Sequence, residues 1–170
     1  MSRFDECLAV VLKLEGGFSD HPADKGGATN QGITQRTYWE YLARKARQPA
    51  DVRDITDDEV RDIYTTHYWN AGKCGQLQPP LDLIHFDACV NHGVGLSGKL
   101  LQSALGMHMQ DGIIGHRTLT AAAEANPLDA AIQYAKRRLE RYIVIAKINP
   151  DQRAFSRGWA RRLGAILRAF

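Results

Sequence analysis

The 170-residue sequence contains few cysteines and no long hydrophobic run. Cys7, Cys74 and Cys89 form an odd number with no CxxC pair, which argues against a disulfide framework or a zinc ribbon. We therefore expect all three to behave as small buried hydrophobic residues. No apolar stretch approaches the roughly 18 residues that are needed to span a bilayer. Because Lys13 and Glu15 interrupt the N-terminal apolar segment, we expect a chain made in a cytoplasm without a signal peptide.

The sequence also lacks internal repeats, low-complexity segments and any linker long enough to require independent domains. A chain of this length can bury a sizeable core, so we predict a single domain spanning residues 1–170. The six histidines show no HExxH or similar ligand spacing. The sequence therefore predicts no metal site and no cofactor.

Charge is nearly balanced overall but unevenly distributed along the chain. The formal net charge is +3, yet residues 131–170 contain ten Lys or Arg against two acidic residues, a net of +8. The remaining 130 residues therefore carry −5. A basic segment on an acidic body favours a polyanionic partner, such as nucleic acid, an anionic membrane or an acidic cell envelope. The alternative is a solvated helix surface.

Hydrophobic periodicity predicts a mostly α protein of the α+β class, with a small β or loop excursion at about residues 17–33. Capping boxes at Ser2 and Thr56 mark two helix starts, and Asn126-Pro127 marks a third. The expected helices begin near residues 3, 34 and 57 and then cover 81–92, 97–105, 119–124, 127–148 and the segment after residue 150.

Glu15 occupies an unusual place for a carboxylate. On a projection of the first helix it falls in the middle of the apolar stripe formed by Phe4, Leu8 and Val11. Apolar surroundings favour the protonated carboxyl group, which is the form that a general acid needs. The alternative is that the last helical turn frays and the side chain reaches water.

Asp24 and Thr29 follow Glu15 in a glycine-rich loop. Eight residues separate Glu15 from Asp24, and glycine pairs on either side allow the loop to fold back on the helix end. One protonated and one ionised carboxyl group across a cleft are suited to splitting a glycosidic bond. Thr29 is a candidate for positioning a water molecule.

The order of these residues resembles a known family. The relevant stretches read Glu15-Gly16-Gly17-Phe18 and Pro22-x-Asp24-x-Gly26-Gly27-x-Thr29-x-x-Gly32-Ile33-Thr34. They resemble glycoside hydrolase family 108, whose members are peptidoglycan-cleaving lysozymes of phages and of bacterial secretion and secretion-activator loci. The spacing is also similar to that of phage-type lysozymes, but one residue fewer separates Asp24 from Thr29. In that other register Asn30 would occupy the threonine position.

The resemblance continues through most of the chain. The matching segments are Tyr64-x-x-x-Tyr68-Trp69, Phe86-Asp87-x-x-Val90-Asn91-x-Gly93, Leu101-Gln102-x-x-Leu105-Gly106, Asp111-Gly112-Ile113-Ile114-Gly115-x-x-Thr118 and Gly158-Trp159-x-x-Arg162. The latter half resembles the predicted peptidoglycan-binding segment of this family. The resemblance implies a lysozyme-like fold of two lobes, with a catalytic segment at 1–93 and a helical peptidoglycan-binding-like segment at 94–170.

The resemblance implies an N-acetylmuramidase that cuts the β-1,4 bond between N-acetylmuramic acid and N-acetylglucosamine, with Glu15 as the catalytic acid. The likeness to phage-type enzymes favours a water-mediated reaction that inverts the anomeric configuration. It also favours a phage endolysin, which is an antimicrobial enzyme that lyses the host cell. Such an enzyme is made in the bacterial host cytoplasm and acts on periplasmic peptidoglycan. The alternatives are a lytic transglycosylase and a non-enzymatic cell-wall-binding module. A zinc amidase is a poorer hypothesis because the histidines lack its ligand spacing.

Four residues are candidates for substrate binding. Tyr68 and Trp69 can stack on sugar faces, although core packing is the commoner use of such rings. Asp87 and Asn91 lie four apart on a helix that is apolar on two sides and is therefore expected to be central and buried. These two residues either belong to a structural network or contact substrate.

The expected C-terminal helix separates an apolar face from a face carrying Arg157, Arg161 and Arg168. One interpretation is a helix that docks its apolar side on the core. The other adds contact with an anionic membrane or lipopolysaccharide. The expected main partner is the peptidoglycan glycan strand. We expect no nucleic acid partner, and we expect the protein to be a monomer.

Overall fold

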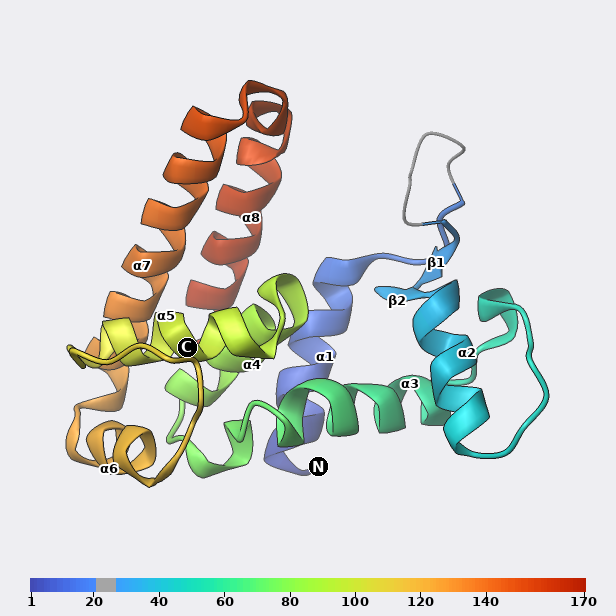
Figure 1. Cartoon of the computed structure of the whole chain (residues 1–170), viewed down its shortest axis with the longest axis horizontal. Helices are drawn as coiled ribbons and strands as arrows, with labels where there is room; N and C mark the ends of the chain where they lie inside the picture. Colours follow the sequence, from blue (N-terminus) through green and yellow to red (C-terminus); the bar gives the residue numbers. More distant parts are fainter. Residues whose placement is uncertain (21–26) are drawn as a thin grey trace. The chain divides into compact units, whose positions relative to one another are not determined.

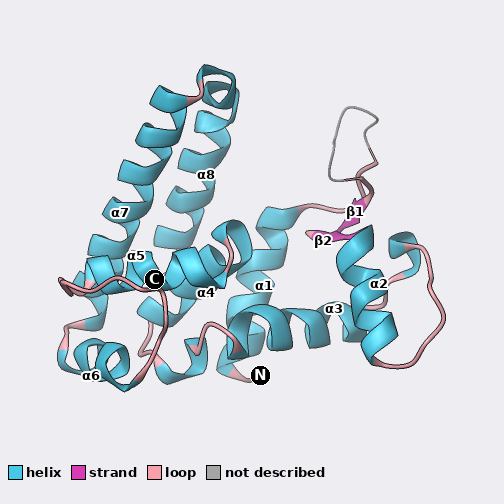
Figure 2. Ribbon diagram, in the orientation of Figure 1, coloured by secondary structure: helices cyan, strands magenta, loops and turns pink. Residues whose placement is uncertain are grey.

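The computed structural model describes residues 1–20 and 27–170 of the chain. Over these residues the protein is mostly helical, with one short two-stranded sheet (Figures 1 and 2), as the sequence predicts. The chain falls into two compact units, Met1–Thr66 and His67–Phe170, which we call unit 1 and unit 2. Among the described residues, no helix combines the length and the apolar character that a membrane crossing requires.

In its described residues, unit 1 contains three α-helices, a 3₁₀ turn and the hairpin. In chain order these elements are α1 (Arg3–Glu15), β1 (Thr29–Asn30), β2 (Ile33–Thr34), α2 (Gln35–Arg44), η1 (Val52–Asp54) and α3 (Asp57–Tyr64). The strands pair antiparallel, Thr29 with Thr34 and Asn30 with Ile33. Ser19 adds a further bridge to Thr29. The predicted excursion into β structure is therefore confirmed in the described part of residues 17–33.

Side-chain caps explain where the helices of unit 1 begin. Both predicted capping boxes are present: Ser2 pairs with Asp5 at the start of α1, and Thr56 pairs with Glu59 at the start of α3. Thr34 caps α2 by accepting a hydrogen bond from the Thr37 amide. Each cap satisfies amide groups that the first helical turn leaves without a partner.

Unit 2 is built around one central helix. The limit between the units falls within η2 (Thr65–Asn70). The elements that follow in unit 2 are η3 (Cys74–Gln76), α4 (Leu81–His92), α5 (Val94–Ala104), α6 (His116–Glu124), α7 (Pro127–Ile148), η4 (Pro150–Phe155) and α8 (Ser156–Leu167). Every residue of α4 from Leu81 to Cys89 is buried. Helix α4 packs against α5, α7 and α8, which confirms that it is central.

The observed elements differ from the predicted ones at several boundaries. Helix α5 begins at Val94, directly after Gly93, rather than at Ser97, which is buried inside the helix. Helix α6 begins three residues earlier than predicted, at His116. The last segment starts as the 3₁₀ helix η4 before α8 begins.

The limit between the two compact units also lies earlier than the segment boundary at 93/94 that the motifs suggest. The physical reason is packing: α4 belongs to the first set of motifs but buries its surface against α5 and α7. Sequence similarity and compactness therefore divide the chain at different places.

Candidate active site

Glu15 is the last residue of α1, where its side chain is half-buried. Phe4, Leu8 and Val11 of the same helix are buried, as the predicted apolar stripe requires. The helix stops at Gly16, whose φ of 78° favours glycine. The carboxyl group therefore sits at the end of a packed helix and not in its middle.

The hairpin turn receives this carboxyl group. Gln31 and Gly32 connect the two strands and both have positive φ, 49° and 77°, as a tight two-residue turn requires. A Cβ atom on Gly32 would lie 2.7 Å from Glu15 Oε2. The same Cβ would lie 2.7 Å from Tyr64 Oη. Only a glycine leaves room for the acid and the phenol to approach the turn this closely.

Tyr64 connects α3 to the hairpin. The residue is fully buried, and its hydroxyl donates a hydrogen bond of 2.8 Å to the Gln31 carbonyl oxygen. Because this bond fixes the turn next to Glu15, Tyr64 is a positioning residue of the candidate site. The site in unit 1 thus joins the end of α1, the β1–β2 turn and the end of α3.

Thr29 and Asn30 play different parts in the hairpin. The Thr29 backbone exchanges two hydrogen bonds of 2.8 Å with Ser19 and holds the strand in register, and its side chain is half-buried. The Asn30 side chain donates to the Val52 carbonyl oxygen at 3.2 Å and is thereby committed to η1. Of the two residues, Thr29 remains the candidate for a role in catalysis. Asp24 lies outside the described residues.

The predicted aromatic contacts lie in η2. Trp69 is buried, with 8% of its surface exposed, and packs edge-to-face on Phe86 at 5.2 Å between ring centroids. Tyr68 is half-buried beside the ring of His67. The structure thus favours the core-packing alternative for Trp69, whereas Tyr68 retains solvent access.

Asp87 belongs to a buried ion-pair network. Its carboxylate is fully buried and pairs with Arg138 Nη1 at 2.7 Å and with Arg162 Nη2 at 2.8 Å. Arg138 also donates to the hydroxyl of Tyr142, which donates to Asn91 Oδ1 at 3.0 Å. For Asp87 the structure favours the structural alternative. Asn91 is exposed at the far end of the same network.

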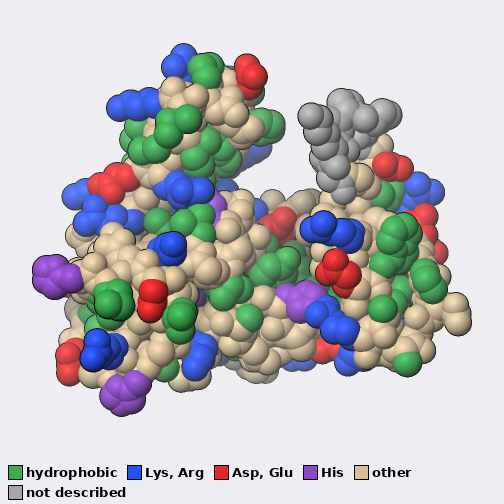
Figure 3. Space-filling model, viewed as in Figure 1, with side chains coloured by type: hydrophobic (Ala, Val, Ile, Leu, Met, Phe, Trp, Pro, Cys, Tyr) green, Lys and Arg blue, Asp and Glu red, His purple; other side chains and the backbone are tan. Residues whose placement is uncertain are grey.

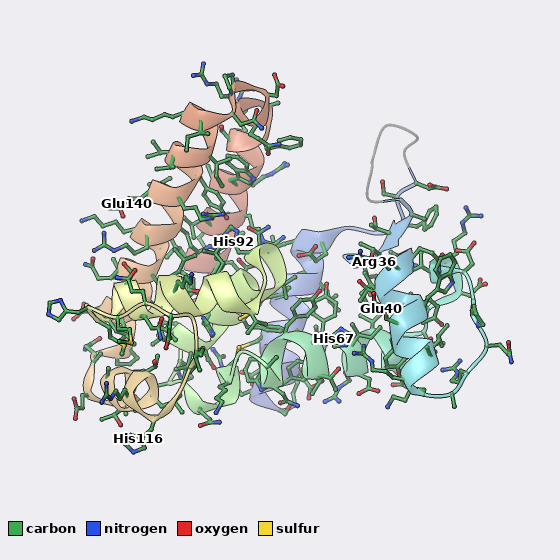
Figure 4. The ribbon with its side chains drawn as sticks, in the orientation of Figure 1. Arg36, Glu40, His67, His92, His116 and Glu140 are labelled. Atoms are coloured by element: carbon green, nitrogen blue, oxygen red, sulfur yellow. The ribbon has the colours of Figure 1, made fainter. Side chains whose placement is uncertain are left out.

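The Asp111–Gly115 turn is organised by one buried amide, that of Gln102. Gln102 Nε2 donates to Asp111 Oδ1 at 2.8 Å, and its Oε1 accepts from the Gly112 amide at 2.9 Å. The bond from Gln102 lowers the pKa of Asp111 and so keeps this carboxylate ionised. Next to the turn lies a cavity of about 520 Å³, whose lining includes His108, His116 and Arg117. His116 is at the start of α6 (Figure 4).

The basic segment is partly internal. Arg138 and Arg162 serve Asp87, and Arg137 pairs with Glu140 at 2.9 Å. Other arginines are exposed, among them Arg157 and Arg161 on α8. Lys and Arg side chains alternate with hydrophobic ones over α7 and α8 in Figure 3. Leu163 and Ile166 of α8 are buried, so the docked face predicted for this helix is present.

Sequence reasoning singled out neither Tyr64 nor Gly32 as a part of the site. Their signals were present, because both belong to the motifs at 29–34 and 64–69. A glycine next to a hairpin position is ambiguous without knowledge of the side chains that approach it. The roles of the Gln102 amide and the Arg138 guanidinium were also not predicted, because their partners become apparent only in the tertiary structure.

Comparisons with known proteins identify the family of this chain. The family model described as Glycosyl hydrolase 108 matches residues 8–93, and the model described as Predicted Peptidoglycan domain matches residues 97–164. The solved structure of SagA from Brucella abortus is similar over 98% of this chain and 92% of that one, with 32% sequence identity and a TM-score of 0.81. Among curated proteins, none matches the chain by sequence. The chain therefore belongs to the glycosyl hydrolase 108 family and is a lysozyme-like glycoside hydrolase that acts on peptidoglycan.

Proposed function

We propose that this hydrolase is an N-acetylmuramidase that cuts the β-1,4 bond between N-acetylmuramic acid and N-acetylglucosamine, with Glu15 as the general acid. One observation carries the proposal: the Glu15 carboxyl group lies against the hairpin turn at Gly32, beside the Tyr64 hydroxyl. A carboxyl group held at a helix end and against a turn has a defined direction, as proton transfer to a substrate oxygen requires.

In this mechanism Glu15 protonates the oxygen of the leaving sugar while the glycosidic bond breaks. Asp24 is the proposed second carboxylate, which activates or replaces the attacking water. Thr29, in the strand that precedes the turn, is proposed to orient that water. Tyr64 acts through its bond to Gln31 and keeps the turn in place.

Unit 2 is proposed to hold the glycan strand and its stem peptides. The cavity beside the Asp111–Gly115 turn is lined by His108, His116 and Arg117, which suit the carboxylates of a stem peptide. Tyr68 and Asn91 retain exposed surface and are the proposed sugar contacts of this unit. We propose neither a nucleic acid partner nor an oligomer for this function.

The decisive experiment replaces Glu15 by Gln, which keeps the size of the side chain and removes its proton. On purified peptidoglycan, we expect the rate of turbidity loss to fall by about 10²–10⁴-fold, the usual contribution of a general acid. The matched control is Glu40→Gln, on the exposed surface of α2 (Figure 4). Substantial clearing by a folded Glu15→Gln protein, with folding checked by circular dichroism, would refute the mechanism.

Product analysis separates the muramidase from its two alternatives. Hydrolysis leaves N-acetylmuramic acid with a free reducing end, whereas a lytic transglycosylase leaves 1,6-anhydro ends. Mass spectrometry of the released muropeptides distinguishes the two products. A non-enzymatic wall-binding module would release no muropeptides, and the Glu15→Gln change would leave its sedimentation with peptidoglycan unaltered.

We further propose that the enzyme serves as a phage endolysin that is made in the host cytoplasm and reaches the periplasm through a holin or a similar route. Expression in a bacterial cytoplasm should then leave cells intact until the inner membrane is permeabilised. Lysis should follow at once in the wild type and not in Glu15→Gln. Rapid lysis without permeabilisation would contradict this proposal.

Contact between α8 and an anionic membrane or lipopolysaccharide is a separate proposal. It is supported by the exposed Arg157 and Arg161 and by a largely apolar cavity of about 370 Å³ lined by residues of α7, η4 and α8. Changing both arginines to Gln should reduce binding to vesicles of anionic lipid. The control pair is Lys13→Gln and Arg36→Gln in unit 1. Equal vesicle binding by both double variants would exclude the contact.

A further inference from the structure

Three chemically reactive side chains meet in the interior of unit 2, apart from the candidate active site. Cys74, His85 and Cys89 are all fully buried. One potential ligand atom from each residue lies within 4.8 Å of the other two. Neither the hydrolytic mechanism nor peptidoglycan binding uses any of them.

Local structure brings these side chains together. His85 and Cys89 are four residues apart on α4 and so share one face of that helix. Cys74 is the first residue of η3, and the preceding backbone turns back at Lys73 with a φ of 51°. A Cβ on Gly72 would lie 2.7 Å from Cys89 Sγ and 3.1 Å from Cys74 Sγ, so the Gly72 backbone faces both sulfur atoms.

Hydrogen-bond partners determine which nitrogen of His85 carries a proton. The Tyr134 hydroxyl has one hydrogen atom, which it donates to the Ser97 carbonyl oxygen at 2.8 Å. Tyr134 Oη therefore accepts from His85 Nδ1, 3.1 Å away, and Nδ1 carries a proton. In a neutral imidazole the lone pair is then on Nε2.

The atoms around Nε2 are potential metal ligands. Its nearest oxygen partner is the Gly72 carbonyl at 3.0 Å, which has no proton to donate. Cys89 Sγ lies 3.5 Å from Nε2, with Cys74 beyond it. In the metal-free protein the Cys89 thiol is the donor within reach of this lone pair. A cation in place of the thiol proton, between Nε2 and the two sulfur atoms, would bind all three.

We propose that Cys74, His85 and Cys89 form a structural site for a thiophilic divalent cation of the Zn²⁺ type. Two thiolates and one neutral imidazole balance a charge of +2, which suits a buried location. With zinc–ligand distances of about 2.0–2.3 Å, tetrahedral ligands are about 3.5 Å apart, close to the observed separation of Nε2 and Cys89 Sγ. The Gly72 carbonyl oxygen is the protein group nearest to Nε2 for the fourth position.

Binding would displace two thiol protons to solvent and leave the oxidation state of both sulfur atoms unchanged. Tyr134 would act as the outer partner that fixes the ring of His85 through Nδ1. The ion would connect η3 to the central helix α4 and so stabilise the position of η3 against that helix. Because all three ligands are buried, the site is structural and has no access to a glycan.

The first test uses the wild-type protein, reduced and freed of metal by a chelator. Titration with Co²⁺ should produce absorption from thiolate-to-cobalt charge transfer together with tetrahedral d–d bands, saturating at one ion per chain. Zn²⁺ should displace the cobalt, and the thermal midpoint should rise as it binds. Absence of a saturable spectrum would overturn the proposal, as would a native disulfide between Cys74 and Cys89 in thiol counting.

Variants test the assignment of the ligands. Cys74→Ser and Cys89→Ser should each abolish the charge-transfer spectrum at one equivalent of Co²⁺. Cys7→Ser is the matched control, because Cys7 is another buried thiol but belongs to unit 1. Tyr134→Phe, which keeps all three ligands, should weaken cobalt binding by about 10-fold.

An unchanged spectrum in either ligand variant would refute the site, as would equal losses in Cys7→Ser. Should a ligand variant fail to fold, the wild-type titration decides alone. Activity on peptidoglycan is not part of either readout, so failure here leaves the proposed muramidase reaction untouched.

Discussion

The two units differ in how deeply they bury charged groups. Unit 1 carries nine basic and twelve acidic residues, and its described ion pairs keep the basic side chain in contact with water. Lys45 and Asp62 are 52% and 34% exposed, and Arg47 is 54% exposed even though its partner Glu59 is buried. Unit 2 carries thirteen basic and seven acidic residues and buries a carboxylate completely between Arg138 and Arg162. The unit with the larger net charge thus uses part of that charge to build its interior.

This difference separates the charges that stabilise the fold from those that remain for partners. An exposed ion pair contributes little to the free energy of unfolding, because water and salt screen the attraction and because two side chains lose conformational entropy. A buried pair is costly to form but still more costly to break, since one partner is left without a counter-ion in a medium of low polarity. We therefore expect the buried Asp87 network of unit 2 to be sensitive to single charge changes and the exposed pairs of unit 1 to tolerate them.

The largest effect should come from Asp87→Asn. The change removes the carboxylate that pairs with two guanidinium groups, one of them the fully buried Arg138. Removing one partner of a buried pair typically costs about 3–5 kcal/mol of unfolding free energy. Urea unfolding followed by circular dichroism measures this loss. The same chemical change at the exposed Asp151 of unit 2 should cost almost nothing, and equal losses at the two sites would abolish the distinction between them.

The second largest effect should come from Gly32→Ala in the β1–β2 turn of unit 1. Gly32→Ala adds a Cβ within 2.7 Å of both Glu15 Oε2 and Tyr64 Oη at a φ of 77°, so we expect a loss of about 2 kcal/mol in unfolding free energy and displacement of the proposed catalytic carboxyl group. Peptidoglycan clearing should fall more than stability does. Gly27→Ala is a matched control, because Gly27 has a φ of 74° but no atom within 4 Å of the added Cβ. Equal activity of the two variants would remove Gly32 from the site.

Much of the local structure could be predicted because its causes are local. The caps at Ser2, Thr56 and Asn126 each involve residues two or three positions apart, and all three are found where the sequence places them. The buried character of α4 likewise follows from apolar residues on two of its sides. The position of Glu15 at the end of an amphipathic helix was visible for the same reason.

The remaining features depend on partners that are distant in the sequence. Arg162 bonds to a carboxylate 75 residues away, and Tyr64 bonds to a carbonyl 33 residues away. The count of ten basic residues in the last segment could not show that Asp87 neutralises part of their charge. Periodicity shows that a polar residue faces the interior, but only tertiary structure shows which group satisfies it.

Acid should affect unit 2 at a higher pH than unit 1. Burial, followed by the positive charges of Arg138 and Arg141, lowers the pKa of His92, at the end of α4 (Figure 4), to about 3. The unfolded chain binds this proton near a pH of about 6.5, so its contribution to stability is complete above that value and declines as the pH falls toward 3. At pH 5 the loss should be about 1–2 kcal/mol.

Glu59 gives unit 1 a different pH dependence. Burial opposes its charged form, but hydrogen bonds from Thr56, Tyr38 and Arg47 outweigh burial and lower its pKa. Its contribution is therefore present above a pH of about 4.3 and is lost only as the pH falls below that value. Hydrogen exchange at pH 7 and pH 5 should show weaker protection in unit 2 alone. His92→Gln should remove that difference, and a uniform loss over both units would contradict it.

The smallest effect should come from Lys45→Gln in unit 1. Lys45 Nζ lies 2.8 Å from Asp62 Oδ2 and 5.6 Å from the centre of the Tyr41 ring, yet its side chain is half-exposed. We expect a loss of less than about 1 kcal/mol in unfolding free energy, because water screens such a pair. Salt should shrink the difference between wild type and variant further, since the Debye length falls from about 10 Å at 0.1 M to about 3 Å at 1 M. Asp62 also accepts from the Tyr41 hydroxyl at 3.0 Å, so its exposed carboxylate keeps a partner in the variant, whereas Asp87→Asn removes the carboxylate next to a fully buried guanidinium group. A loss as large as that of Asp87→Asn would show that exposure is the wrong measure of what an ion pair contributes in this protein.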